Sequence, residues 1–288
     1  MDMVVERELL HSDCLPTLRD IARMLGMDLE LCESRWEKNQ ERDASHSEEA
    51  DRLRETQRAV RDSAGLALIV LLGDRLGTPS LPATIDATTF EAFLAQLARL
   101  GRSSERLTKS YERDTNPVPN VYTLKRIDKL VPHFLSLEDA AKREQAEKAW
   151  QRDFSAPMIE DIKLATLGMV KDGMLTQDES DQLLCPCAMR DALRGVSLDA
   201  DISTSRGHAR KATRSVLVHR HFLQMDPRDE LAAKYIDVSQ KAPDTQAASL
   251  LERVKCSLKK KICDENVVDF EVPWKTGGLD GGLSLIHI

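Results

Sequence analysis

The stretch that decides the fold runs from Leu66 to Leu72 and reads LALIVLL, an unbroken aliphatic run between Gly65 and Gly73. Continuous apolar runs of this length are typical of parallel strands that helices cover on both faces. The sequence therefore predicts that 66–72 is a central strand of a parallel sheet.

Helices and further strands alternate on both sides of this run. Apolar residues recur at helical spacing over 4–25 and again from Ala247 to Ile262. The stretches 121–124, 215–222 and 267–272 have the composition of strands. This alternation predicts an α/β chain with a doubly wound parallel sheet.

Local signals predict where several elements begin and end. Pro16 predicts a kink near Asp13 in the first helix, and Gly26 predicts its end. The segment 29–36 alternates like a half-buried strand. The apolar face of the first helix is predicted to consist of Leu10, Cys14, Leu18, Ile21 and Leu25. N-terminal caps are predicted at Thr88 with Glu91, Ser136 with Asp139, and Thr176 with Glu179.

Composition limits the classes of partner. The 288 residues carry a net charge of −7, which argues against non-specific nucleic-acid binding because that requires a basic face. The longest apolar run is too short to span a bilayer, so no membrane partner is expected. Six scattered cysteines and an acidic start without an apolar leader favour a reducing, cytoplasmic location.

Several stretches resemble one family. They are Val4 to Leu10 (VVERELL), Leu31 to Trp36, Ala64 to Gly77 (AGLALIVLLGDRLG), Tyr111 to Ile127 (YERDTNPVPNVYTLKRI) and Val268 to Asp280. Together they resemble the region upstream of the ATPase domain in NACHT- and WD-repeat-containing proteins, a family of STAND NTPases. One departure is that Glu37 follows Trp36, where the family has a glycine.

The resemblance implies a TIR- or flavodoxin-like α/β organisation in several parts. Residues 1–128 would form a TIR-like domain that lacks its first strand, and 129–205 a helical linker. Residues 206–280 would form a smaller α/β segment leading towards a missing NACHT domain. The last residues, 281–288 (GGLSLIHI), resemble translated sequencing adapter and are expected to be an artefact.

The resemblance also implies a function. It indicates a non-catalytic regulatory region of a signalling NTPase that binds protein partners or itself. ATP is expected in the missing NACHT domain, and no cofactor is expected in these residues. The candidate interaction surface is Arg35, Trp36, Asp74 and Arg75, because these residues follow predicted strands and Trp and Arg are frequent interface hot spots. The competing interpretation is fold maintenance, with Trp36 buried.

An alternative function is cleavage of NAD, as some TIR domains perform. In those domains a glutamate stabilises the developing oxocarbenium charge, as in other glycoside chemistry. The family's acidic helix-start residue falls on Ala50 here, which leaves Glu49 as the catalytic candidate one residue away. The competing interpretation is an acidic first helical turn that favours the helix dipole.

The sequence gives little support for a metal site or for a phosphate-binding loop. Cys185 and Cys187 are spaced more closely than the cysteine pairs of structural zinc sites, and His219 and His221 share one face of a predicted strand. No metal site is therefore predicted. No Gly-Lys-Ser/Thr sequence occurs, so 73–77 (GDRLG) is interpreted as a tight turn after the strand and not as a phosphate loop.

Overall fold

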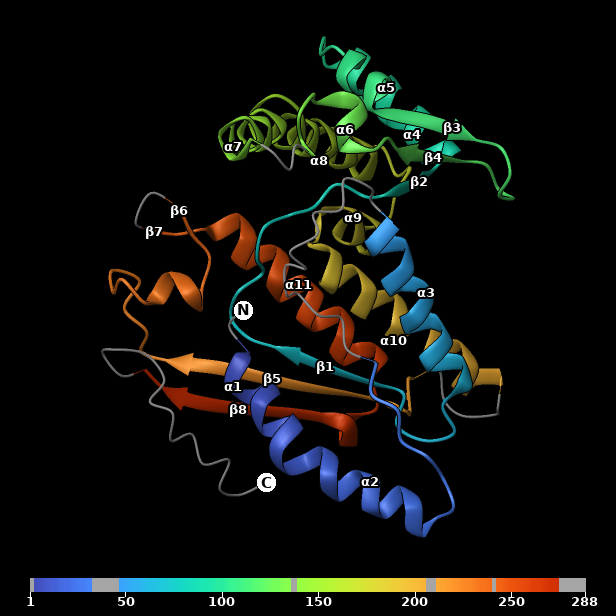
Figure 1. Cartoon of the computed structure of the whole chain (residues 1–288), viewed down its shortest axis with the longest axis vertical. Coiled ribbons are helices and arrows are strands. Elements are labelled where there is room, and N and C mark those ends of the chain that lie inside the picture. Colours follow the sequence, from blue (N-terminus) through green and yellow to red (C-terminus); the bar gives the residue numbers. More distant parts are fainter. Residues whose placement is uncertain (1–2, 33–46, 136–138, 206–210, 240–241, 275–288) are drawn as a thin grey trace. The chain divides into compact units, whose positions relative to one another are not determined.

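The computed structural model describes residues 3–32, 47–135, 139–205, 211–239 and 242–274. The chain forms two compact units that are interleaved along the sequence (Figure 1). Unit 1 comprises Met1–Glu33, Glu55–Gly77 and Ala192–Ile288, and unit 2 comprises Ser34–Arg54 and Thr78–Asp191. Mixed helices and strands, with a parallel sheet in unit 1, confirm the α/β class.

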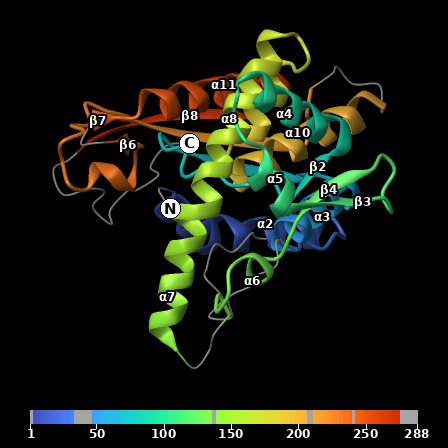
Figure 2. The same ribbon diagram turned by 90° about the horizontal axis from the view of Figure 1, so that it is seen from above.

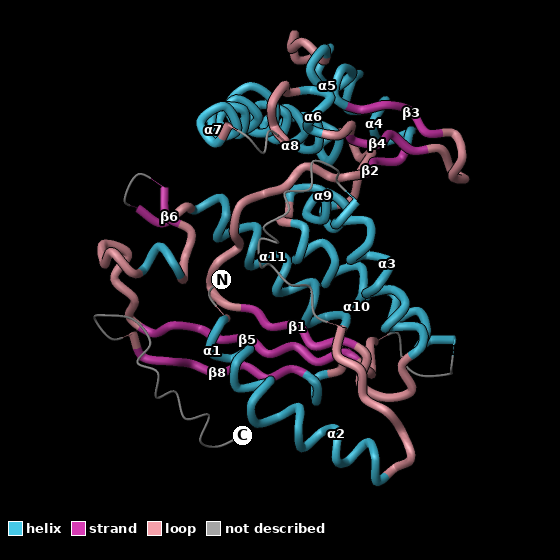
Figure 3. Tube along the Cα trace, viewed as in Figure 1, coloured by secondary structure: helices cyan, strands magenta, loops and turns pink. Residues whose placement is uncertain are grey.

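The parallel sheet has the order β1-β5-β8 and lies within unit 1 (Figure 3). Its strands are β1 (Leu68–Leu72), β5 (Ser215–Leu223) and β8 (Val267–Pro273). Pairing of Leu72 with His219 sets the register between β1 and β5. All three strands were predicted, but among the described strands β5 is central and the aliphatic strand β1 lies at an edge.

Helices cover both faces of this sheet, and neighbouring residues of β5 show it. Adjacent residues of a strand point to opposite faces. His219 lies near Lys255 and Lys259 of α11, whereas Arg220 pairs with Glu6 of α1. The sheet therefore separates α11 from the N-terminal helices, as Figure 2 shows. The helices of unit 1 are α1 (Val4–Leu9), α2 (Leu15–Met24), α11 (Thr245–Lys261), the end of α3 (Ser47–Asp62) and most of α10 (Cys187–Ser205).

Shorter elements complete unit 1. They are the π-helical turn η1 (Leu10–Cys14), the 3-10 turns η3 (Ala232–Lys234) and η4 (Asp264–Asn266), and the two-residue strands β6 (Val238–Ser239) and β7 (Ala242–Pro243).

The N-terminal segment bends where it was predicted to bend, but it buries a different face. Turn η1 lies just before Pro16, and Gly26 ends the segment with a left-handed φ of 69°. The predicted apolar face is mostly outside the core, since Ile21 is 48% and Leu25 65% exposed. The buried residues of α2 are Leu15 and Ala22. The apolar row found in the sequence is therefore not the row that α2 buries.

Two further local predictions need correction. The described part of the predicted strand 29–36, residues 29–32, has no strand structure, and the rest lies outside the described residues. The cap of α4 is not Thr88, because Asp86 accepts the N–H of Thr89 and the helix begins at Ala87. The capping box of Thr176 and Glu179 is confirmed.

Unit 2 combines a small antiparallel sheet with helices. Its sheet has the order β2-β4-β3. The strands are β2 (Thr84–Asp86), β3 (Tyr111–Asp114) and β4 (Val121–Leu124). The helices are α4 (Ala87–Arg99), α5 (Glu105–Ser110), α6 (Ile127–Leu130), α7 (Ala140–Ala149), α8 (Ala156–Lys171) and α9 (Gln177–Leu184), with the π-helical turn η2 (Trp150–Ser155) joining α7 to α8.

The core of unit 2 is built where α4 crosses its sheet. The ring of Phe90 stacks on Tyr122 with centroids 4.1 Å apart, and Tyr111 donates a hydrogen bond to the carbonyl of Pro82. Burial of such rings supplies much of the free energy that holds a small sheet together.

The strand pairing divides the chain differently from the predicted boundaries at 128 and 205. Strand β1 pairs with β5, so residues on both sides of those boundaries build one sheet. Strand β4, predicted from the sequence as a strand, pairs with β2 and β3 in unit 2.

Candidate functional site

The site lies beside the carboxyl end of β1, where Asp74 is the second residue after the strand. Strand β5 continues past the end of β1, so its backbone there has no strand partner on that side among the described residues. Asp74 takes this place: its Oδ2 accepts the N–H of Phe222 at 2.8 Å, and its Oδ1 lies 3.1 Å from Nδ1 of His221. The carboxylate thus continues the pairing beyond the strand.

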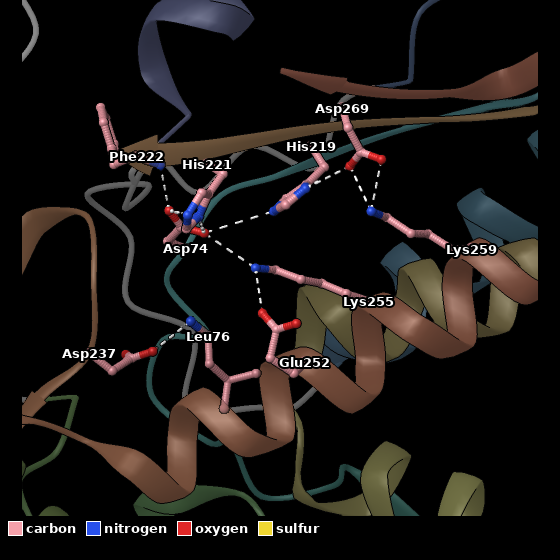
Figure 4. Close-up of polar contacts among 10 residues, drawn as sticks. All are labelled: Asp74, Leu76, His219, His221, Phe222, Asp237, Glu252, Lys255, Lys259 and Asp269. Carbon is pink, nitrogen blue, oxygen red and sulfur yellow. Dashed lines mark hydrogen bonds and ion pairs between the residues drawn. The ribbon is translucent and has the colours of Figure 1, made fainter. Parts of the chain in front are cut away.

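Helix α11 places a lysine side chain beside the same carboxylate. Nζ of Lys255 donates to Oδ1 of Asp74 at 3.2 Å and to Oε1 of Glu252 at 2.9 Å (Figure 4). The side chains of Lys255 and Asp74 are only 7% and 11% exposed. A buried ammonium needs such partners, because burying an unpaired charge is costly.

His219 joins Asp74 to a second carboxylate. Its Nδ1 lies 2.8 Å from Oδ1 of Asp269, and its Nε2 lies 3.8 Å from Oδ1 of Asp74. Asp269 also accepts two hydrogen bonds from Nζ of Lys259, at 2.7 and 2.8 Å. The imidazole is therefore placed between two carboxylates, each of which also contacts a lysine of α11 (Figure 4).

These contacts keep both carboxyl groups ionised. Burial alone raises the pKa of Asp74, but the nearby His219 imidazole, the hydrogen bonds from Phe222 N–H and His221, and the charge of Lys255 hold it well below 3.8. Burial likewise raises the pKa of Asp269, and Lys259 and His219 lower it below its ordinary value. A carboxylate with so low a pKa is a weak proton acceptor at neutral pH. The arrangement is suited to holding elements together more than to moving protons.

The loop after Asp74 is fixed by a further carboxylate. Asp237 accepts the N–H groups of Leu76 at 2.6 Å and of Gly77 at 3.1 Å. Gly77 has a φ of 90°, a conformation that favours glycine. Successive N–H groups of this kind could hold a phosphate, but here a side chain of the same unit occupies them.

The predicted interaction residues fall into two groups. The carboxylate of Asp74 points into unit 1 and is held there, whereas the side chain of Arg75 is 34% exposed. Arg75 lies 3.7 Å from Asp237 and donates to the carbonyl of Lys234 at 3.5 Å. Arg35 and Trp36 lie outside the described residues.

Glu49, the NAD-cleavage candidate, lies in the first turn of α3. Its side chain is outside the described side chains, so its direction is not part of the structure described.

The cysteines and histidines that were weighed as a metal site occupy different units. Cys185 is fully buried at the end of α9, and Cys187 begins α10, both in unit 2. His219 and His221 lie on β5 of unit 1. Within the described ranges, no group of three or more His, Cys, Asp or Glu residues is arranged to hold a metal ion.

Sequence reasoning missed the lysines and acidic residues that complete the site. Lys255 lies beside Leu251, Val254 and Leu258 on the buried face of α11. A lysine on an apolar helical face is the signal that could have revealed it, because a buried lysine is nearly always paired. Nothing local identifies its partner, since Asp74 is 181 positions away.

Comparison with known proteins gives three relatives of one kind. "NACHT domain- and WD repeat-containing protein 1" of Mus musculus is 30% identical over 152 residues, which are 52% of this chain and 10% of that protein. "NACHT and WD repeat domain-containing protein 2" is 24% identical over 52% of the chain in Homo sapiens and 25% over 64% in Mus musculus. The chain is homologous to NACHT- and WD-repeat-containing proteins.

This confirms the resemblance seen in the sequence. The chain spans about a tenth of the length of the NACHT- and WD-repeat-containing proteins it matches. No family model matches the chain, and no solved structure matches it. Among the described residues, no helix combines the length and apolarity that crossing a membrane requires.

Proposed function

We propose that this chain is a non-catalytic regulatory and protein-interaction region of a NACHT- and WD-repeat-containing signalling NTPase that acts in the cytoplasm. The observation that carries the proposal is the site at Asp74. Its charged groups, which could otherwise have formed a reaction centre, bind one another, and Asp74 is kept ionised by Lys255 and two histidines. Homology to NACHT- and WD-repeat-containing proteins supports the same role.

In the proposed mechanism, the network makes a rigid edge from which Arg75 reaches solvent. Asp74 fixes the start of the loop, and Asp237 fixes its end at Leu76 and Gly77. A rigid loop loses little conformational entropy when a protein partner binds it. The partner is a protein or a second copy of the chain, and ATP would bind in a NACHT domain outside these 288 residues.

The first test measures association of the full chain. Sedimentation of the purified chain over a concentration series, alone and with the NACHT-containing remainder of the mouse relative, should reveal a complex that Arg75→Ala weakens. Arg113→Ala is the matched control, because Arg113 is a half-exposed arginine of unit 2. If the chain stays monomeric and does not bind the NACHT-containing remainder, the proposed interaction role is wrong.

The second test addresses catalysis. The full chain, incubated with NAD, is expected to release no more nicotinamide than its Glu49→Gln variant. Release by the wild-type chain that Glu49→Gln abolishes would replace the proposed role with NAD cleavage.

A further inference from the structure

A pocket of about 530 Å³ lies along α11 in unit 1. The residues that line the pocket include Lys211, Glu252, Lys255, Lys259, Lys260 and Asp264. Its volume lies in the range of sites that bind small molecules. The lining holds four lysines and two acidic residues, and two of these lysines, Lys255 and Lys259, also pair with Asp74 and Asp269.

Two lysines of the pocket are available to donate hydrogen bonds to a ligand. Lys260 is exposed and forms no hydrogen bond or ion pair with any described residue. Among the described residues, Lys211 pairs with Asp264, whose side chain is 88% exposed. Such a solvent-exposed pair contributes little, so Lys211 can exchange it for a ligand at small cost.

His219 supplies a buried group at the inner end. The residue is 8% exposed, and Asp269 fixes its ring through Nδ1 at 2.8 Å. Its Nε2 is buried and has no hydrogen-bond partner among the described residues; Oδ1 of Asp74 is 3.8 Å away. Buried polar atoms are nearly always satisfied, so a buried Nε2 without a hydrogen bond favours a ligand atom at this place.

The acidic residues do not cancel this preference for anions. Glu252 and Asp264 stand at the rim with side chains 70% and 88% exposed, where water screens them. The deeper carboxylates, Asp74 and Asp269, are already occupied by Lys255 and Lys259. Among the described residues, Lys260 has no such carboxylate partner, and Lys211 has the exposed Asp264.

We propose that this pocket binds a soluble phosphate monoester. Lys260 and Lys211 contact the phosphate oxygens, and one of these oxygens reaches His219 Nε2. Lysine is a common point-charge partner of phosphate, and several convergent cations select a dianion over a singly charged carboxylate. The remaining pocket volume accommodates the ester group of a small metabolite.

The proposal is tested by titrating the full chain with inorganic phosphate and with ribose 5-phosphate at low salt, following the imidazole NMR signals. Binding should shift the His219 signal but not that of the exposed His133, and ribose 5-phosphate should bind more tightly than phosphate. Lys260→Gln and Lys211→Gln should each weaken binding about tenfold, the effect of losing one charged hydrogen bond.

Lys171→Gln is the matched control, since Lys171, like Lys260, is an exposed lysine in the last turn of a helix. Lys171→Gln should leave the affinity unchanged. Equal weakening by all three variants would show non-specific attraction to surface charge and overturn the proposal. Absence of a His219 shift, or binding only to phosphatidic acid vesicles, would overturn it as well.

Discussion

Asp74 accepts the backbone N–H of Phe222 at 2.8 Å, so a side chain extends the parallel pairing of β1 with β5 beyond the last residue of β1. The same carboxylate receives Lys255 from α11 at 3.2 Å. One residue therefore holds together the end of a strand, its neighbour and the covering helix.

Replacing Asp74 with Asn should lower the free energy of unfolding by about 3 kcal/mol, because Lys255 then keeps its charge without a buried carboxylate. The amide oxygen of the variant can still accept the N–H of Phe222, so the loss of stability measures the effect of removing the negative charge of Asp74. The measurement is urea unfolding followed by circular dichroism. Asp264→Asn, which removes an 88% exposed carboxylate from Lys211, should cost no more than about 0.5 kcal/mol. Unchanged unfolding of Asp74→Asn would contradict the network.

Acid should weaken unit 1 through the same carboxylate. The pKa of Asp74 is lower in the folded chain than its ordinary value of 3.8. Its contribution to stability is therefore complete above the unfolded pKa and is lost as the pH falls through the folded pKa. As the pH is lowered below about 5, the urea concentration at the unfolding midpoint of the wild-type chain should decrease. The urea midpoint of the Asp74→Asn variant should decrease less steeply with falling pH. If the plots of urea midpoint against pH are parallel for the two proteins, Asp74 is not a source of the acid sensitivity.

The sequence was informative wherever a strand is defined by its own composition. The runs that became β1, β5 and β8 were predicted because apolar and β-branched residues mark them locally. Their pairing was not predictable in the same way. Residues 78–191, most of unit 2, lie between β1 and β5 in the chain, and no local pattern shows that such a stretch forms a separate compact unit.

The N-terminal helix shows the limit of periodicity. The pattern found an amphipathic helix and its bend, but the apolar row it found, which includes Ile21 and Leu25, is not the row that the structure buries. The structure buries Leu15 and Ala22. Periodicity identifies an apolar face, whereas the neighbour that covers it depends on contacts far away in sequence.

The pair between Glu6 and Arg220 should anchor α1 to the sheet. Arg220 is fully buried, and its guanidinium lies 4.4 Å from the ring centroid of Phe222. Glu6→Gln removes the carboxylate and should destabilise the chain by about 3 kcal/mol. In the same variant, hydrogen exchange of the Val4–Leu9 backbone amides should become faster. Glu8→Gln, at an exposed position of the same helix, should change neither quantity.

Gly195 allows α10 to approach β1 closely. A Cβ at this position would lie 2.9 Å from Cδ2 of Leu68 and 3.1 Å from Cγ2 of Thr56. Overpacking of this kind costs about 1–3 kcal/mol, and the better helix propensity of alanine offsets about 1 kcal/mol. Gly195→Ala should therefore destabilise the chain by about 1 kcal/mol in urea unfolding.

The contact with Leu68 can be isolated by a double-mutant cycle. Leu68→Val shortens the side chain that the new methyl group meets, so the double variant should be more stable than the sum of the single effects predicts. Gly65→Ala is the control, because no atom lies within 4 Å of a Cβ there. If Gly195→Ala is as harmless as Gly65→Ala, the helix has room to move away from β1, and close packing at Gly195 does not fix its position.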